Sequence, residues 1–285
     1  MCRLYGFRAT EPTTVDCTLV SAQNALIVQS QRDQEGRSNA HGWGVAVYPN
    51  GGLPHVERQA WAAYHGEHFR EAAARAHART VVAHVRRATM GVPALENTHP
   101  FTYRRWAFAH NGTLRAFGKI RGRMREAMTP EHRAALQGTT DSEHIFYFLL
   151  SLRERDPDRS PLDTLRAGLQ QLILWSRGAD PEAPIGLNVL WTDGECLVGS
   201  RWRRTLFYLE RDEVRDCEVC GCPHVEPVPG TPYRAAVVAS ERISHEPWRE
   251  VPEGSAFAVD EAVRLHFEPL EQQPTSADDK AAAEP

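Results

Sequence analysis

The chain opens with MCRLYGF (residues 1–7), so a cysteine stands directly behind the initiator methionine. Removal of Met1 would leave Cys2 with a thiol and a free α-amino group on one residue. A thiol has a pKa near ~8.5 and an α-amino group one near ~7.7–8.0, so this amine can accept the thiol proton at physiological pH. On position alone, a small hydrophobic residue that merely follows Met1 is the commoner case. The opening therefore suggests an N-terminal nucleophile, which other segments must support.

The composition is that of a soluble globular protein. The 285 residues are 41% hydrophobic and 25% charged, and 33 Lys and Arg against 37 Asp and Glu give a net charge of -4. This balance argues against a nucleic-acid-binding protein. The sequence contains no run of about 18 apolar residues and no basic, apolar leader, so we expect no membrane association and a cytoplasmic location.

Strand patterns come first and last in the chain, with helix patterns between them. Helices are expected over residues 17–34, 67–80, 140–155 and 160–177. Strands are expected over residues 2–9, 42–48, 56–66, 80–88, 106–112, 185–194, 195–202, 205–212, 233–240 and 255–267. A loop is expected over residues 11–16, and Asn50-Gly51 is expected to form a hairpin turn between the second and third of these strands. Because strands and helices do not alternate regularly, the order predicts an α+β fold with antiparallel sheets. We expect one domain over residues 2–268 and a disordered tail over residues 269–285, which is polar and rich in Ala and Pro.

The segment HNG, which ends a predicted strand, supplies two candidate catalytic residues, Asn111 and Gly112. Acyl transfer passes through a tetrahedral oxyanion, and an Asn side chain beside a glycine N–H forms a compact pair of donors for it. The same dipeptide is also a common turn, in which case the strand simply ends there.

Charged groups that can hold a substrate lie in two further segments. The segment AHVRRATMG places Arg86 and Arg87 at the end of an apolar strand, where a guanidinium can bind a carboxylate through two hydrogen bonds. One of the two can equally be a surface arginine. In TTDSE, Asp141 can bind an ammonium group, although capping the following helix is the commoner use of such an aspartate.

Taken in this order, MCRLYGF, HVRRATMG, NTHPF, WAFAHNG and TTDSE resemble the class II glutamine amidotransferases, which are N-terminal-nucleophile (Ntn) hydrolases. The resemblance covers roughly residues 1–265. It is closest to short, stand-alone members similar to the γ-glutamyl hydrolase of ergothioneine biosynthesis, which share an LNVLWTDG-like hairpin and a VVASE-like strand. The resemblance implies an αββα sandwich of two antiparallel sheets flanked by helices.

The resemblance also implies a role for each matching residue. Cys2 would attack the γ-carboxamide carbon, while Asn111 and Gly112 would hold the oxyanion. Arg86 would grip the α-carboxylate of the glutamyl group and Asp141 its α-ammonium. Opposite charges at the two ends of this group would fix the γ-carbon against the thiol.

The loop around Thr89 would complete the wall of the pocket, and near it the chain departs from the family. His41 stands where many members have an aspartate. Arg87 stands where better-known amidotransferases carry a tryptophan, and Met90 where they carry a histidine. These departures weaken the prediction that free glutamine is the substrate.

The favoured function is hydrolysis of a small-molecule γ-glutamyl amide through a γ-glutamyl thioester at Cys2, with no cofactor required for catalysis. As an alternative, a glutaminase subunit would deliver ammonia to a separate synthase, since the sequence holds no Walker A or GxGxxG segment for an acceptor domain. A third alternative, of another class, is a non-catalytic binding or scaffold module on the same fold.

The segment CEVCGCPHVEP contains Cys217, Cys220, Cys222 and His224, which are enough donors for a structural zinc site. Against this reading, the donors are crowded into one segment, whereas structural zinc sites usually draw their two halves from separated segments. A flexible, reduced loop is the commoner alternative, and redox or partner binding is a third. Cys17 is expected to be a buried small hydrophobic residue.

Overall fold

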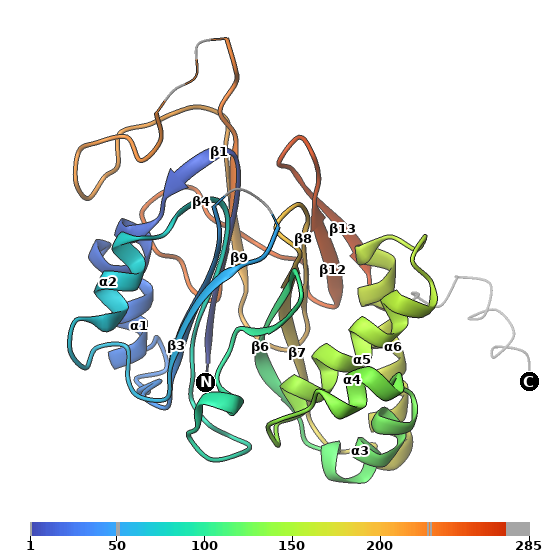
Figure 1. Cartoon of the computed structure of the whole chain (residues 1–285). Coiled ribbons are helices and arrows are strands. Elements are labelled where there is room, and N and C mark those ends of the chain that lie inside the picture. Colours follow the sequence, from blue (N-terminus) through green and yellow to red (C-terminus); the bar gives the residue numbers. More distant parts are fainter. Residues whose placement is uncertain (1, 50–51, 227, 229, 272–285) are drawn as a thin grey trace, which may run out of the picture.

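A computed structural model of the chain describes residues 2–49, 52–226, 228 and 230–271. Two antiparallel sheets lie face to face at the centre, and helices cover the outer face of each sheet (Figure 1). The layers run helix, sheet, sheet, helix. This arrangement confirms the expected α+β class and the αββα sandwich.

The first sheet has seven strands, with β1 at its centre. In spatial order they are β11 (Arg249–Glu250), β9 (Phe207–Arg211), β10 (Ala235–Ala239), β1 (Arg3–Thr14), β4 (His77–Val85), β2 (Trp43–Tyr48) and β3 (His55–Gln59). β1 pairs with β10 on one side and with β4 on the other. The residue after Met1 therefore stands at the head of a central strand.

The second sheet has six strands and leaves part of one edge open. Their spatial order is β13 (Leu265–Pro269), β12 (Ser255–Val259), β8 (Leu197–Arg201), β7 (Ile185–Thr192), β6 (Trp106–Leu114) and β5 (Phe101–Tyr103). β5 pairs with β6 only from Trp106 to Phe108, whereas β7 pairs with β6 as far as Leu114. Beyond Phe108, the edge of β6 that faces away from β7 is thus free to meet side chains.

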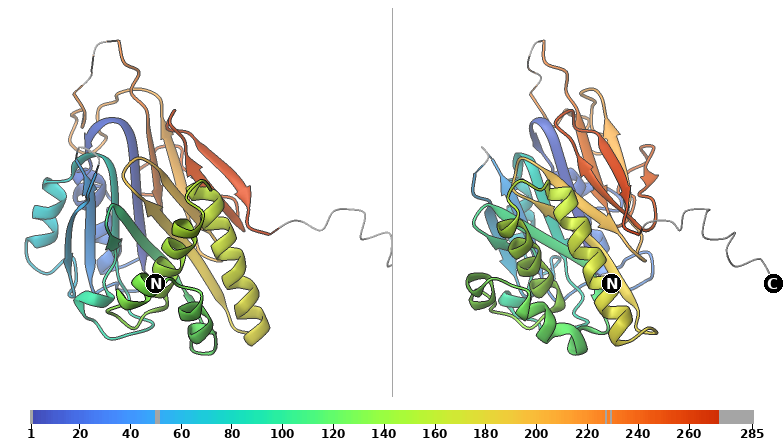
Figure 2. Two further views of the ribbon diagram at one scale, coloured as in Figure 1. Left: turned by 45° about the vertical axis from the view of Figure 1, so that its right-hand side comes forward. Right: turned by 90° about the vertical axis from the view of Figure 1, so that its right-hand side faces the viewer.

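The helices form two groups, one for each sheet. The π-helix η1 (Cys17–Ser21), α1 (Leu26–Gln31) and α2 (His68–Ala74) cover the first sheet, while α3 (Phe117–Glu126), α4 (Pro130–Ala134), α5 (Asp141–Arg155) and α6 (Pro161–Ala179) cover the second. A 3-10 turn, η2 (Leu95–Asn97), precedes β5. Figure 2 shows the two longest of these helices, α5 and α6, lying against the second sheet. Thr140, the residue before Asp141, caps α5 and accepts a hydrogen bond from the N–H of Glu143.

The side chains of β1 alternate between two environments, as in any strand. Tyr5 belongs to the apolar core beneath α1 and α2. Leu4 belongs to the core between the sheets, and a Cβ on Gly6 would meet Leu190 Cδ1 at 2.9 Å. Cys2 continues the series of Leu4 and Gly6, so the alternation places it at the margin of the space between the two sheets.

Several predicted elements have the wrong extent, among them the strand expected over residues 56–66, which is β3 and ends at Gln59. The helix expected over residues 17–34 is divided into η1 and α1, because Ala22 adopts an extended backbone with ψ 155°. The helix expected over residues 67–80 ends at Ala74, since the residues that follow form β4. The strand expected over residues 255–267 is a hairpin of β12 and β13.

Two local interpretations are also wrong. Asn111 and Gly112 do not end their strand in a turn; β6 continues through both residues to Leu114, in register with β7. Residues 11–14, expected in a loop, extend β1 beyond a register shift in its pairing with β4. α3 and α4 were not expected at all.

Two further predictions fall on residues that the structure does not describe. The Asn-Gly turn at residues 50–51 lies outside the described ranges, although β2 and β3 pair as the hairpin requires. The predicted tail lies outside them from residue 272 onward, and Leu270 is buried in the second core. Among the helices of the described part, none is long and apolar enough to cross a membrane.

Candidate active site

A cavity of about 540 Å³ lies where the start of β1 meets the segment after β4 and the end of β6. Its walls are formed by Cys2, Glu35, Arg37, Arg87, Ala88, Thr89, Asn111, Gly112, Thr113, Arg115, Pro184 and Arg204. The fold therefore brings together the three predicted catalytic residues and Thr89 around one space, although they lie far apart in the sequence.

Strand alternation explains why Cys2 and Asn111 face the same space. Cys2 continues the face of β1 that carries Leu4, and Asn111 shares a face of β6 with Ala109. Leu4 and Ala109 both belong to the core between the sheets. Cys2 and Asn111 consequently project from opposite sheets into the cavity at the margin of this core.

The thiol of Cys2 is held by the backbone of Arg87. The N–H of Arg87 donates to Sγ at 3.3 Å, and Sγ donates to the carbonyl oxygen of Arg87 at 3.4 Å. Burial raises the pKa of the Cys2 thiol, while the Arg87 N–H and the charge of Arg86 partly oppose this rise. Because the pKa is raised, the sulfur keeps its proton at neutral pH and needs a base to become a nucleophile.

Arg3 anchors the head of β1 through a buried charge network. Its guanidinium pairs with Asp33 at 2.9 Å and with Glu241 at 2.6 Å, and it also donates to the carbonyl oxygen of Cys2 at 3.0 Å. Glu241 accepts a further hydrogen bond from the N–H of Gln34. Removing one partner of such a network would leave a buried charge uncompensated, so the network resists disruption. Because Arg3 also binds the Cys2 carbonyl oxygen, the network holds the backbone of Cys2 in place.

The side chain of Asn111 is oriented by Ser240, which follows β10. Nδ2 of Asn111 donates to Ser240 Oγ at 3.3 Å, and the N–H of Leu4 donates to the same oxygen at 2.9 Å. An amide nitrogen carries two hydrogens, and within the described residues Nδ2 makes no other hydrogen bond. Ser240 and Glu241 belong to the VVASE segment, whose positioning role the sequence analysis missed.

The N–H of Gly112 points toward the open edge of β6. In a strand, the N–H groups of alternate residues point to the same side. The N–H of Leu114 donates to Asp141 Oδ2 at 2.8 Å on the open edge, whereas the N–H of Arg115 donates to the Pro184 carbonyl toward β7. Gly112 shares the direction of Leu114, so its N–H faces away from β7, on the side where the cavity lies.

A glycine is required at position 112 because β6 and β7 approach closely. A Cβ there would lie 2.0 Å from the carbonyl oxygen of Gly186 and 2.5 Å from Nε2 of His110. His110 itself is buried, with Nε2 2.9 Å from the Gly186 oxygen and Nδ1 2.9 Å from Ser142 Oγ. The need for glycine thus comes from packing rather than from a turn.

Arg86 does not line the cavity in this conformation. Its guanidinium donates to the carbonyl oxygens of residues 90–92 at 2.9 to 3.4 Å and so orders the loop behind Thr89. Burial lowers the pKa of Arg86, and the charges of Cys2 and Asp141 oppose this. Arg86 is therefore within electrostatic reach of both residues, and its carboxylate-binding role stays a prediction.

Thr89 and Asp141 fix the wall between β6 and α5. Thr89 lines the cavity and lies 3.0 Å from Thr113, hydroxyl to hydroxyl. Asp141 is buried outside the cavity wall, where it accepts hydrogen bonds from the N–H groups of Leu114 at 2.8 Å and Ser142 at 2.9 Å. Its ammonium-binding role likewise stays a prediction.

His41 supports the segment that holds the thiol. Nδ1 of its imidazole accepts a hydrogen bond from the backbone N–H of Ala88 at 2.9 Å, and the backbone N–H of His41 donates to the Arg86 carbonyl oxygen. Burial, followed by the charges of Arg86 and Arg87, lowers the pKa of His41. The imidazole is therefore neutral at physiological pH, as an acceptor at Nδ1 must be.

The cavity is more basic than the motifs indicated. Arg37, Arg115 and Arg204 line it beside Arg87, against the single carboxylate of Glu35, which pairs with Arg37 at 2.8 Å. Among the described residues, Nη1 of Arg87 and Nε of Arg204 are buried without a hydrogen-bond acceptor. No local sequence pattern marks these arginines, because they reach the cavity from separate loops.

The structure gathers three of the four predicted metal ligands, together with one residue that was not predicted as a ligand. The ligand atoms of Cys17, Cys217, Cys220 and His224 all lie within 4.8 Å of one another. Cys222 is exposed and does not belong to this cluster. Cys17 is buried as expected, but its sulfur has two thiols and an imidazole as neighbours.

Comparison with known proteins gives the class that this fold and cavity define. The family description "Glutamine amidotransferases class-II" matches residues 1–282, and the chain belongs to this family. The predicted family is thereby confirmed, and the protein is an amidohydrolase-like enzyme.

Individual relatives cover nearly the whole chain. The probable glutamine amidotransferase DUG3 of Saccharomyces cerevisiae is 28% identical over 304 residues, which is 93% of this chain and 84% of the relative. The gamma-glutamyl-hercynylcysteine sulfoxide hydrolase of Mycolicibacterium smegmatis is 26% identical over 268 residues, 92% of this chain and 97% of the relative. A solved glutamine aminotransferase class-II domain protein from Silicibacter pomeroyi has a TM-score of 0.63 at 20% identity and covers 94% of this chain and 99% of its own, which shows the fold.

Proposed function

We propose that the mature protein hydrolyses a γ-glutamyl amide, with Cys2 as its N-terminal nucleophile. The observation that carries the proposal is that Cys2, Asn111 and Gly112 line one cavity from facing sheets. A thiol, a side-chain amide and a backbone N–H directed into one space are the groups that acyl transfer from an amide requires.

Removal of Met1 supplies the base that the protonated thiol needs. The freed α-amine of Cys2 takes the thiol proton, and Sγ attacks the γ-carbonyl carbon while Asn111 Nδ2 and the N–H of Gly112 donate to the oxyanion. The amine product leaves with that proton. Water then attacks the γ-glutamyl thioester, which releases glutamate and restores the thiol. None of these steps uses a cofactor.

Substrate positioning falls to Arg86, Asp141 and Thr89 in this proposal. Arg86 would exchange the carbonyl oxygens of residues 90–92 for the α-carboxylate of the glutamyl group, and Asp141 would bind its α-ammonium. The electrostatic interaction of Arg86 with both Asp141 and Cys2 supports this arrangement. Thr89, which lines the cavity, would close the wall.

The charge of the cavity favours a free-standing hydrolase over an ammonia-delivering glutaminase. Four arginines and one carboxylate line a space of about 540 Å³, within the range of ~300–1,000 Å³ for small-molecule pockets. Buried guanidinium N–H groups that lack an acceptor carry a free-energy cost, which a ligand carboxylate would relieve. We therefore propose a γ-glutamyl substrate whose leaving amine carries a further negative charge.

The test is glutamate release by the full chain, tagged at its C-terminus so that Met1 can be removed. The substrates are glutamine, a γ-glutamyl alkylamide and a γ-glutamyl amino acid, which has an extra carboxylate on the leaving amine. We expect the highest kcat/KM for the γ-glutamyl amino acid. A preference for glutamine would favour ammonia delivery to a synthase instead.

An uncleaved N-terminal extension provides the matched control, because it leaves every side chain in place but acylates the α-amine of Cys2. We expect this protein to fold and to release no glutamate. Full activity of the extended protein would contradict the proposed base. Absence of turnover by either protein on every γ-glutamyl substrate would favour a binding or scaffold module.

A further inference from the structure

The four-residue cluster Cys17, Cys217, Cys220 and His224 has the dimensions of a metal site. Tetrahedral zinc with Zn–S distances of about 2.3 Å places its ligand atoms about 3.7 Å apart. Sγ of Cys220 lies 3.5 Å from Nε2 of His224, and all four ligand atoms lie within 4.8 Å of one another. Closure around an ion therefore needs side-chain shifts of only about 1 Å or less.

The backbone between Cys217 and Cys220 is already folded around sulfur. The N–H of Val219 donates to Cys217 Sγ at 3.4 Å, and the N–H of Gly221 donates to the Cys217 carbonyl at 2.8 Å. Gly221 has a φ of +71°, a left-handed conformation that glycine adopts without strain. This tight turn brings both sulfurs to one side and directs a peptide N–H to the sulfur of Cys217.

His224 carries the accessory contact that metal-binding histidines usually have. While Nε2 faces the sulfur of Cys220, Nδ1 lies 3.6 Å from Oδ1 of Asp16. That carboxylate oxygen is buried and has no hydrogen-bond partner among the described residues. A carboxylate behind the second ring nitrogen fixes the tautomer and orientation of a zinc-binding imidazole.

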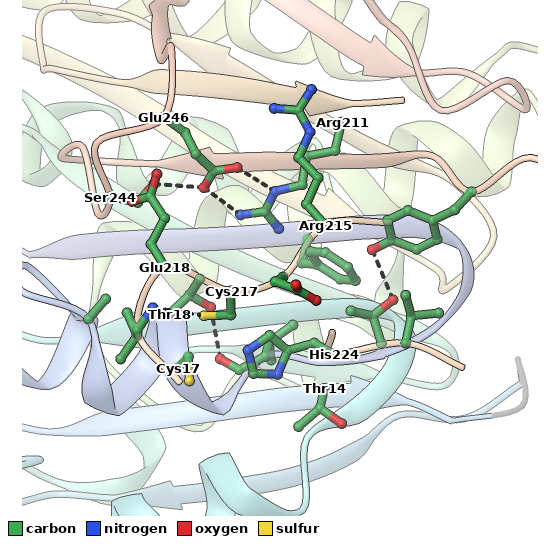
Figure 3. Close-up of a pocket in the computed structure, with 18 of the residues that line it drawn as sticks. Thr14, Cys17, Thr18, Arg211, Arg215, Cys217, Glu218, His224, Ser244 and Glu246 are labelled. Atoms are coloured by element: carbon green, nitrogen blue, oxygen red, sulfur yellow. Dashed lines mark hydrogen bonds and ion pairs between the residues drawn. The ribbon is translucent and has the colours of Figure 1, made fainter. Parts of the chain in front are cut away.

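Cys17 supplies the separated half that the cysteine-rich segment lacks. It starts η1, directly after β1, whereas the other three ligands lie in the loop between β9 and β10. A backbone hydrogen bond of 2.9 Å from the N–H of Thr14 to the His224 carbonyl holds the two segments together. Figure 3 shows Cys17, Cys217 and His224 gathered at one side of a pocket of about 130 Å³.

We propose that Cys17, Cys217, Cys220 and His224 bind one structural zinc ion that fastens the β9–β10 loop to η1. Three thiolates and one imidazole form a closed tetrahedral set that suits zinc. On binding, the three thiols release their protons to solvent, and no change of oxidation state occurs. β1 separates this site from Cys2: Arg3 and Thr14 lie opposite Val85 and His77 of β4, which at about 3.4 Å per residue are roughly 27 Å apart, so the ion takes no part in the hydrolysis.

The test is the zinc content of the purified full chain, measured by elemental analysis together with its variants. We expect about one zinc per chain in the unaltered protein and in Cys222→Ser, and a loss of about tenfold or more in Cys220→Ser and Cys17→Ser. Cys222→Ser is the matched control, since it removes a thiol from the same segment. Zinc lost from Cys222→Ser but retained in Cys17→Ser would overturn the ligand set.

His224 gives a second test that does not disturb the buried Cys17. We expect His224→Ala to lose zinc and His224→Cys to retain it, because a fourth thiolate also completes a tetrahedral site. The unaltered protein loaded with cobalt should show the visible absorption of a tetrahedral thiolate site. A chain that takes up neither metal after reduction, or that forms a disulfide within the cluster in the presence of equimolar zinc, would overturn the proposal.

Discussion

The two ends of β1 carry two cysteines with different surroundings. At its head, Cys2 is contacted by the backbone of Arg87 and lies in a cavity lined by arginines. Beyond its other end, Cys17 lies among two thiols and an imidazole. The same side chain is thus set up to attack a carbonyl carbon in one place and to bind a metal in the other. The comparison teaches that the groups folded around a thiol decide its chemistry.

The largest expected effect is the loss of glutamate release when Cys2 is replaced, which should leave the zinc site beyond the other end of β1 intact. Cys2→Ala should lower glutamate release by about 10⁴-fold or more, because no other group at the head of β1 can form the thioester. Glutamate release is followed with the preferred γ-glutamyl substrate, and zinc content is the control, which should not change. Glutamate release that persists in Cys2→Ala would show that Cys2 is not the nucleophile, and the proposed chemical difference between Cys2 and Cys17 would be lost.

Loss of the side-chain oxyanion donor should have the next largest effect. Asn111→Ala should lower kcat by about 10²–10³-fold and leave KM less affected, since the donor acts on charge that develops in the transition state. Steady-state kinetics measures both constants. Asn24→Ala is the control: it removes an Asn that donates to Glu241 and the Arg242 carbonyl outside the cavity. Equal losses in both variants would point to a structural effect.

Binding of the glutamyl group should change by a smaller factor. A hydrogen bond to a charged group is worth about 1.5–3 kcal/mol, so Arg86→Ala should raise KM about 10–100-fold. Arg87→Ala tests the alternative that the cavity-lining arginine binds the α-carboxylate. A larger loss in Arg87→Ala, with a γ-glutamyl alkylamide as substrate, would transfer the role from Arg86 to Arg87.

The smallest effect is expected at the far end of β1. Binding of a ligand at 100 times its Kd stabilises a fold by about 2.7 kcal/mol, so removal of zinc by a chelator should lower Tm by about 5–10 °C. Calorimetry measures the shift, with Cys17→Ser as the variant on which the chelator should have no effect. Below the transition, glutamate release should be unchanged. An immediate loss of turnover on chelation would show that hydrolysis at Cys2 depends on the metal, which would contradict a purely structural role for the zinc ion.

The sequence predicted most of the head of β1, because strand alternation and family motifs are local patterns. MCRLYGF reads as a strand whose side chains alternate, and this alone directs Cys2 to the space between the sheets. Ser240 and the arginines Arg37, Arg115 and Arg204 were missed, since they reach the cavity from segments distant in sequence.

Two differences between the sequence-based expectations and the structure share one physical cause, namely that local sequence does not show which distant segments pack together. Cys222 was grouped with Cys217 because it is near in sequence, whereas in space the ligand atoms of Cys217 and Cys220 cluster with the distant Cys17. Asn111-Gly112 was read as a turn, although the glycine is needed because the Gly186 carbonyl leaves no room for a Cβ. Tertiary packing decides both cases, and no local propensity records it.

Intact-mass measurement tests the central claim most directly. The C-terminally tagged protein is incubated with diazo-oxo-norleucine, an electrophilic glutamine analogue, and its mass is compared with that of the untreated protein. The account predicts a chain without Met1 that gains one adduct at Cys2, and no adduct in Cys2→Ala. A chain that retains Met1 and still turns over a γ-glutamyl substrate would contradict the account.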